Sequence, residues 1–260
     1  RPIATFSGTV SDSDGRPLVG AEVSYGNPST DMSIEPWITD DLGRFSGQVQ
    51  VVEGGVLTVR AEGHVVQHLS GSAEGPSDSA QLDVHAGEIV SDIEFSLENG
   101  SSASGSITLP SGTDSASISV TAVDPSTGEE VAQTLATKQG GGKLAYRLEG
   151  IPDGDYALRF DDAGGALASS FAGGALTLYE AEVFSFASSE PGDDIDVMLR
   201  DAAVVSGQIL LPEGISAVTP ITVTPYLMVG DSWIAYESAL IQLHEGRASG
   251  STERVWEYSI

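Results

Sequence analysis

The sequence predicts an all-β protein built from tandem β-sandwiches, and three observations lead to this prediction. Turn-forming residues are frequent, with 31 glycines and 12 prolines in 260 residues, while long stretches of helical periodicity are missing. Short segments of alternating apolar and polar residues recur between the turns, as expected for strands that bury one face. Finally, short sequence tags return at a spacing of about one domain, which indicates repeated units.

Two sequence tags mark the predicted units. A Ser-Gly tag occurs at Gly8, Gly105 and Gly207, each time followed two positions later by an aliphatic residue. An Asp-Ile-acid-apolar-x-Leu tag occurs at 92–97 and again at 194–199. Both tags recur after about 100 residues, a period that indicates a tandem array. We therefore expect three domains, covering residues 1–99, residues 100–201 and a partial third repeat at residues 202–260.

The first unit has frequent turns and about seven short strands, which is the spacing of a β-sandwich. The turn signals are Asp12–Gly15, Asp40–Gly43 and Gly54-Gly55, where aspartate and glycine favour tight turns. Between the turns, apolar residues alternate with polar ones, so that each segment has one face for the core. The expected strands cover residues 4–10, 21–25, 37–39, 45–51, 56–60 and 93–97.

The second unit repeats this plan. Its turn signals lie at 124–128 and 150–155, and alternating segments flank them. The expected strands cover residues 115–123, 144–148, 156–160 and 194–199.

One segment of the second unit carries a helical signal, at residues 172–181. Thr177 and Glu180 have the spacing of a capping box, which predicts a short helix there. The linkers between units, at 98–102 and 200–203, are short. Short linkers predict restricted motion between the units.

The third unit is expected to hold only the first strands of the plan. Residues 256–260 have the pattern of its middle strand, but the sequence contains no third closing tag. We therefore expect that the array continues, or that another segment completes the sheet. An unfinished sandwich exposes strand edges that invite pairing.

The first unit also resembles a known family. Residues 8–12 with 15–23 resemble the opening of a carboxypeptidase regulatory-like domain, and residues 39–45 are similar to the next signature of that family. Residues 54–59, followed by Glu62-Gly63-His64, resemble the third signature, with His64 where the family usually has an aromatic residue. The resemblance covers most of the first unit.

The second unit is a weaker relative. Residues 150–156, 171–175 and 194–199 resemble units found in tandem in secreted actinobacterial surface proteins. The resemblance implies tandem Ig-like or transthyretin-like β-sandwiches of seven strands. It also implies an accessory, non-catalytic role, and the wider carbohydrate-binding-like fold to which such domains are related suggests a link to polysaccharides.

The charge of the chain excludes several classes of partner. There are 38 acidic and 11 basic side chains, for a formal net charge of −27. Nucleic-acid binding needs Lys and Arg to replace phosphate counterions, and anionic membrane surfaces repel an acidic protein. We therefore expect no nucleic-acid partner and no membrane insertion, since no apolar run reaches the ~18 residues of a membrane span. An acidic, Lys-poor surface is also typical of halophiles, which remains an alternative reason for the charge.

The motifs of common enzymes are missing. His64 and His68 have zinc-like spacing only on a helix, whereas the local pattern predicts a strand, on which four residues span ~13 Å. The chain has no Gly-x-Ser-x-Gly elbow, and Gly140–Lys143 lacks the spacing of a phosphate-binding loop. Acid pairs are abundant, but glycosidases need two carboxylates that face each other across a cleft. These pairs are Asp40/Asp41, Asp153/Asp155, Asp161/Asp162 and Asp193/Asp194.

Two kinds of ligand remain open. No cofactor is predicted, but calcium is possible: Asp12 and Asp14 lack the later Glu of the helical calcium loop, whereas linkers of β-sandwiches can bind calcium without a motif. The residues of a metal site are unknown. An exposed row of aromatic side chains would suit stacking on sugars, although buried aromatics would simply be core. The candidate carbohydrate-binding residues are Trp37, Trp233, Tyr236 and Trp256.

The sequence therefore favours a non-catalytic structural or adhesive module of a bacterial surface or secreted protein, a stalk or spacer located outside the cell or at the cell wall. Its expected partners are further domains of the same polypeptide and a polysaccharide or another ligand on a host or cell-wall surface. The alternative is a set of carbohydrate-binding accessory modules of a polysaccharide-active enzyme. A hydrolase is the third hypothesis and rests only on the abundant carboxylates.

Overall fold

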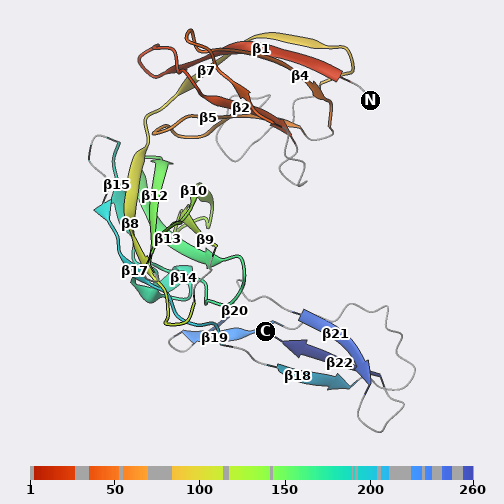
Figure 1. Cartoon of the computed structure of the whole chain (residues 1–260), viewed down its shortest axis with the longest axis vertical. Helices are drawn as coiled ribbons and strands as arrows, with labels where there is room; N and C mark the ends of the chain where they lie inside the picture. The colour runs from red at the N-terminus through yellow and green to blue at the C-terminus, as the bar shows by residue number, and fades with distance from the viewer. Residues whose placement is uncertain are drawn as a thin grey trace.

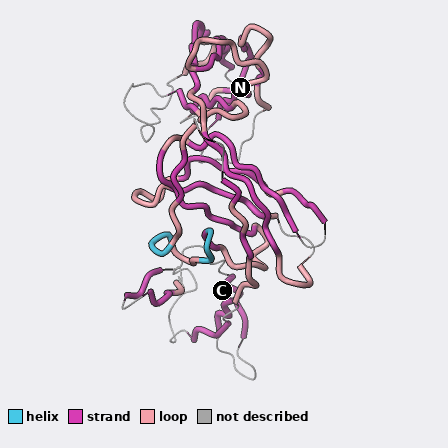
Figure 2. The backbone as a smooth tube through the Cα atoms, turned by 90° about the vertical axis from the view of Figure 1, so that its left-hand side faces the viewer, coloured by secondary structure: helices cyan, strands magenta, loops and turns pink. Residues whose placement is uncertain are grey.

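The computed structural model shows a chain whose regular secondary structure, in the part that is described, consists almost entirely of strands, arranged in three groups along the longest axis (Figure 1). A view turned by 90° shows the same succession of groups (Figure 2). The all-β fold class predicted from the sequence is confirmed. The structure describes residues 3–26, 35–52, 55–69, 84–113, 117–140, 143–188, 190, 193–203, 206–210, 224–229, 232–235, 242–247 and 254–259.

The first unit consists of two sheets. One sheet has the order β4-β1-β7, in which β1 pairs antiparallel with β4 and parallel with β7. The other has the order β3-β2-β5-β6 and is antiparallel throughout. The strands are β1 (Ile3–Asp12), β2 (Glu22–Gly26), β3 (Trp37–Ile38), β4 (Arg44–Gln50), β5 (Val56–Arg60), β6 (Gln67–Leu69) and β7 (Ile89–Leu97).

The core of the first unit follows from the alternation along these strands. Phe6 and Val10 of β1 are fully buried, and so are Val23 of β2 and Leu57 of β5. The ring of Phe6 lies 5.1 Å from that of Tyr25. Burying one such side chain contributes about 1.5–3 kcal/mol, so this shared apolar interior holds the two sheets together.

Two turns of the first unit have the same sequence pattern, Asp-x-x-Gly-Arg, and the same structure. In each, the aspartate Oδ1 (Asp12 or Asp40) accepts backbone N–H bonds of 2.8–2.9 Å from the residues two and four positions later. The glycine, Gly15 or Gly43, has φ of +80° or +69°. Other residues rarely adopt this conformation, so aspartate and glycine together specify the turn.

The second unit has the same arrangement of two sheets with additional strands, and its closing strand is divided into two short strands. Its sheets have the orders β11-β12-β8-β16, with β17 also on β8, and β10-β9-β13-β14, with β15 on β13. β8 again pairs antiparallel with the middle strand β12 and parallel with the closing strands β16 and β17. The strands are β8 (Ser101–Thr108), β9 (Ile118–Val123), β10 (Glu130–Leu135), β11 (Thr137–Gly140), β12 (Lys143–Ile151), β13 (Gly154–Asp162), β14 (Ser170–Phe171), β15 (Phe184–Phe186), β16 (Asp193–Asp194) and β17 (Val197–Met198).

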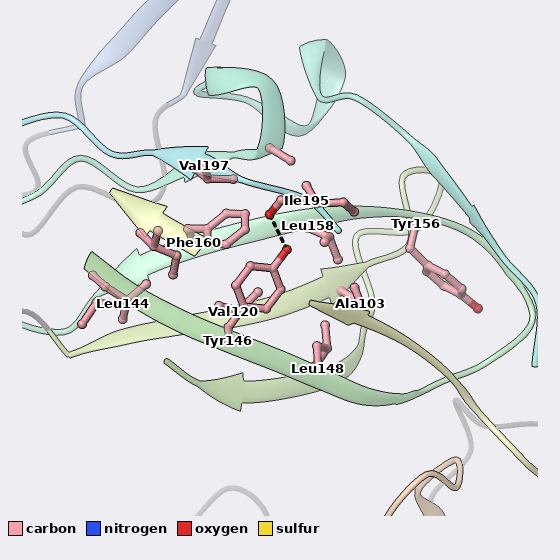
Figure 3. Close-up of a cluster of buried hydrophobic side chains, with 14 of the residues drawn as sticks. Ala103, Val120, Leu144, Tyr146, Leu148, Tyr156, Leu158, Phe160, Ile195 and Val197 are labelled. Carbon is pink, nitrogen blue, oxygen red and sulfur yellow. Dashed lines mark hydrogen bonds between the residues drawn. The ribbon is translucent and has the colours of Figure 1, made fainter. Parts of the chain in front are cut away.

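Figure 3 shows the core of the second unit. Side chains of β12 lie against those of β9 and β13, and the rings of Tyr146 and Phe160 meet edge to face at 5.5 Å. The Tyr146 hydroxyl donates a hydrogen bond of 2.8 Å to the backbone carbonyl of Ile195, drawn as a dashed line. Tyr146 is the one labelled side chain of this core with a hydrogen bond drawn in Figure 3, and that bond links the middle strand to the closing segment.

The prediction of one short helix at 172–181 is wrong. The segment holds two separate 3₁₀ turns, η1 (Ala172–Gly174) and η2 (Leu178–Glu180). Gly173 and Gly174 have φ of +80° and +86°, which ends any right-handed helix. Thr177 precedes η2 but makes no side-chain cap bond, so the expected capping box does not form.

The third group contains a sheet of order β18-β22-β21 and a hairpin of β19 and β20. Gly207 of β18 stands opposite Tyr258 of β22, just as Gly105 stands opposite Tyr146 in the second unit. β22 therefore takes the place of β12, and it includes Trp256, in the segment predicted as the middle strand. The strands are β18 (Ser206–Leu210), β19 (Tyr226–Val229), β20 (Ser232–Ala235), β21 (Gln242–Arg247) and β22 (Arg254–Ser259).

Candidate functional site: the unit junctions and the paired strands

The linker that leaves the first unit is bonded to that unit. The Val65 N–H donates to the Glu98 carbonyl, and the Gly100 N–H donates to the Gly63 carbonyl, both at 2.9 Å. Between these bonds, His64 lies opposite Asn99 in an antiparallel bridge. The three linker residues thus continue as a short strand along the loop that follows β5.

The linker that leaves the second unit is held in the same way. The Ala168 N–H donates to the Arg200 carbonyl, and the Ala202 N–H donates to the Ala166 carbonyl, both at 3.0 Å. Leu167 lies opposite Asp201, as His64 lies opposite Asn99. We call each arrangement a linker bridge: the loop 63–65 with 98–100, and the loop 166–168 with 200–202. Two such bridges with the same bonds make this a repeated feature of the architecture.

At the first junction the next unit comes into close contact. Gly150, at the end of β12, has φ of +72°, and a Cβ at this position would come within 3.0 Å of the His64 carbonyl oxygen. A Cβ at Gly100 would similarly come within 3.0 Å of the Gly150 backbone. Only glycine allows this approach of two backbones, so the sequence of the Gly150 turn is adapted to the junction.

A groove of about 590 Å³ lies beside this junction and is lined by both units. Two of its carboxylates are engaged: Glu130 binds Arg159 at 2.6 Å, and Glu149 binds Arg147. The hydrogen bond that Arg147 donates to Glu149 raises the pKa of Arg147, and burial together with the charge of Arg60 lowers the pKa of His68. The charged and imidazole side chains that line the groove are Glu22, Arg60, Glu62, His64, His68, Glu130 and Glu149.

The two histidines have protein partners. His68 lies on β6, where its Nδ1 is 2.9 Å from the Thr58 hydroxyl, whereas His64 lies in the loop before that strand, with Nδ1 2.7 Å from the Glu62 carbonyl. The prediction that both lie on one strand is therefore wrong for His64, because the loop 63–65 pairs with the linker. Within the described ranges, no group of three or more His, Cys, Asp or Glu side chains is arranged to hold a metal ion.

Some aspartates of the acid pairs bond within their own turn or strand, whereas others, such as Asp194 with the Ser104 hydroxyl, bond to a distant strand. Asp162 accepts three backbone N–H bonds of its own turn, and Asp161 pairs with Arg159 at 2.6 Å. The Arg16 N–H lowers the pKa of Asp12, and the Arg44 N–H lowers that of Asp40. Asp12, Asp40 and Asp162 thus stabilise turns, and calcium binding stays a prediction.

The four candidate aromatic residues differ in burial and in position. Trp37 is half-buried: its ring stacks on Phe45 at 6.2 Å and covers Gly47, where a Cβ would come within 3.0 Å of the indole. Trp233, on β20, is 65% exposed. Trp256 lies on β22, and Tyr236 lies outside the described residues. The structure does not bring Trp37 and Trp233 together, because they belong to different units.

The two sequence tags contact each other, which the sequence analysis did not predict. Gly8 of the opening tag lies beside Ile93 of the closing tag, and Gly105 lies beside Ile195. In both units a Cβ on the glycine would come within 3.0 Å of the isoleucine carbonyl oxygen. A sequence signal for this contact was available, because the glycine and the isoleucine recur together in the first and the second unit.

No protein-family model matches the chain, so the resemblance to carboxypeptidase regulatory-like domains stays a prediction. No curated protein matches either. No helix among the described residues is long and apolar enough to cross a membrane.

The comparison with solved structures finds all-β proteins at low similarity. A Bacillus anthracis protein described as TIE is 17% identical over 78% of this chain and 35% of its own, with a TM-score of 0.26. A streptococcal ancillary pilin is 13% identical over 75% of this chain and 62% of its own, at 0.28. The major pilin subunit of Bacillus cereus is 9% identical over 90% of this chain and 81% of its own, at 0.26. The chain spans less than two thirds of the first two proteins, and at these TM-scores their roles are not transferred to it.

Proposed function

We propose that this chain is a non-catalytic structural or adhesive module of an extracellular or cell-wall-associated bacterial protein, in which tandem sandwiches act as a stiff spacer. Further domains of the same polypeptide would be held at a defined distance by these units. The observation that carries the proposal is the linker bridge, which occurs with the same backbone bonds after the first and the second unit.

The linker bridge matters because a free linker would let neighbouring units reorient. Backbone hydrogen bonds contribute about 0.5–1.5 kcal/mol each, and two bonds with a bridge leave the linker little independent motion. Contact between Gly150 and the His64 carbonyl then fixes where the second unit starts. The acidic surface, with a net charge of −27, suits a spacer because it discourages the units from associating side by side.

Distance measurements between spin labels test this proposal. The chain contains no cysteine, so Ser46→Cys in the first unit and Thr137→Cys in the second place one label each at exposed sites. A stiff junction gives one narrow distance distribution. A broad distribution in the otherwise unchanged chain would contradict the spacer.

A glycine pair provides the matched control. Gly150→Val places a side chain against the His64 carbonyl and should broaden the distribution. Gly128→Val introduces a similar backbone strain, at φ of +76°, but a side chain there has no atom within 4 Å. Equal broadening by both variants would show that the junction contact has no special role.

A second candidate function, carbohydrate binding, is favoured by one observation. The hairpin of β19 and β20 exposes Tyr226, Met228 and Trp233, and Met228 stands directly opposite Trp233. An exposed aromatic face of this kind can stack on sugar rings. Titration with soluble polysaccharides should then change tryptophan fluorescence, and Trp233→Ala should abolish the change. Trp37→Ala is the control, since this ring packs against Phe45. If the fluorescence change on titration persists in Trp233→Ala, the hairpin is excluded as the site.

A further inference from the structure

In the first and the second unit, the first and last strands are direct neighbours and run parallel. In the first unit, β1 pairs with β7 from Thr5↔Ile89 to Asp12↔Leu97. In the second unit, β8 pairs with β16 at Asp194↔Ser104 and with β17 at Met198↔Thr108. The chain therefore enters and leaves each unit through two adjacent strands with the same direction.

This arrangement determines how tension would act on a unit. A pull on the chain draws β1 toward Ile3 and draws β7 toward Leu97, so the two strands are pulled in opposite directions along their common axis. The hydrogen bonds between them lie across the strands and are loaded together, in shear. Antiparallel neighbours at the two ends would instead separate from one end, one bond after another.

We propose that the first and the second unit are each a tension-resisting clamp, in which the opening and closing tags form the two halves of the mechanical contact. This goes beyond the spacer function, because a stiff spacer need not resist a pull along its axis. Gly8 and Gly105 allow the strands to lie in close contact, since any side chain there would strike the isoleucine carbonyl. The same tags that repeat in the sequence thus form the contact that bears the force.

The second clamp uses side chains where its ladder is interrupted between β16 and β17. Asp196 Oδ1 accepts bonds from the Ser106 N–H at 2.8 Å and from the Ser106 hydroxyl at 2.7 Å. The Ser104 hydroxyl donates to Asp194 at 2.7 Å. These bonds also run between β8 and the closing segment, so they are loaded in the same direction.

Single-molecule pulling of the full chain tests the clamp through its direction dependence. In the first unit, handles at Ile3→Cys and Asn99→Cys load β1 against β7 in shear. Handles at Ser13→Cys and Asn99→Cys pull from the Asp12–Leu97 end and peel the same pair apart. All three positions are exposed, and the chain has no other cysteine. We expect the shear geometry to unfold at roughly twofold higher force or more, because the hydrogen bonds between the two strands must break together.

A pair of serine variants tests the second clamp, with handles at Asn99→Cys and Asp201→Cys. Ser106→Ala should lower the unfolding force. Ser126→Ala removes a similar Ser–Asp bond, of 2.6 Å to Asp124, in a turn outside the clamp, and should leave the force unchanged. Asp196→Asn is the second clamp variant if Ser106→Ala does not fold. Equal forces in the two pulling directions, or equal losses in Ser106→Ala and Ser126→Ala, would overturn the clamp while leaving the spin-label result on the spacer intact.

Discussion

The first two units have the same arrangement of two sheets but close their sandwiches differently. In the first, β1 and β7 form a nearly continuous ladder with one irregularity between Phe6 and Gly8, where Asp92 adopts φ of +60°. In the second, the ladder is interrupted, and side chains of Asp194, Asp196 and Tyr146 bond across the gap. One closing contact is therefore made mainly by the backbone, and the other depends on particular side chains.

The residues at the middle strand explain part of this difference. Phe45 stands opposite Gly8, and Tyr146 stands opposite Gly105 at the equivalent position. Phe45 packs among Trp37 and Phe95, whereas Tyr146 carries a hydroxyl that reaches the Ile195 carbonyl. Burial raises the pKa of Tyr146, so the hydroxyl stays protonated and remains a donor. The Tyr146 hydroxyl is therefore one of the groups that hold the closing strand in the second unit and that the first unit lacks at the equivalent position.

The largest expected effect comes from the tag glycines. Gly8→Ala should destabilise the first unit, and Gly105→Ala the second, by about 3 kcal/mol or more, because the Cβ forces the closing strand away. Hydrogen exchange resolved by segment assigns each loss to its unit. Gly164→Ala is the control, since its nearest neighbour would be at an ordinary 3.4 Å. If Gly8→Ala and Gly105→Ala lose no more stability than Gly164→Ala, the close contact between the strands is not needed for folding.

Replacing the glycine by alanine should lower the stability of the protein by different amounts in the two Asp-x-x-Gly-Arg turns. Gly15→Ala meets only the cost of a left-handed backbone, about 1–2 kcal/mol. Gly43→Ala adds a collision with the Val10 carbonyl and should cost more, about 3 kcal/mol. Denaturant unfolding of the two variants measures the difference. Equal costs would show that β1 shifts freely to accommodate the new side chain.

Tyr146→Phe tests the side-chain contribution in the second unit. The change leaves the buried Ile195 carbonyl without its donor and should cost about 1–3 kcal/mol in that unit alone. Tyr179→Phe, at a tyrosine that is 84% exposed, should have no effect. A loss that also appears in the first unit would show that the units unfold as one body.

The smallest expected effect is on the pH dependence of the stability of the second unit. The Ser106 N–H and hydroxyl, with a smaller effect of the Lys143 charge, lower the pKa of Asp196 below its ordinary value of 3.8. Its contribution is therefore present at neutral pH and disappears as the pH falls through the lowered pKa. Asp196→Asn should reduce the acid sensitivity of the second unit, measured by its unfolding midpoint between neutral and acid pH. The first unit, whose Asp12 and Asp40 also have lowered pKa values, should keep its own acid sensitivity unchanged.

The sequence predicted features that depend on neighbouring residues. The turn at Asp12–Gly15 and the alternation of β1 were predicted because aspartate, glycine and a period of two act over a few residues. The helix predicted at 172–181 was wrong, although the capping signal of Thr177 is also local. The positive φ angles of Gly173 and Gly174 interrupt a right-handed helix in the same segment, and they outweigh that signal. The half-buried state of Trp37 was not predicted, since it depends on Phe45 and Gly47 of another strand.

By itself, the sequence determined the all-β class, the repeat and the two tags, since composition, periodicity and recurrence are properties of the chain. Only the tertiary structure decided that the tags lie side by side and that each linker is bonded to the unit it leaves. Gly8 and Ile93 are far apart along the chain, and their contact depends on every strand between them folding into the two sheets. Periodicity specifies which face of a strand is buried, but the choice of its neighbour is made by packing across the whole unit.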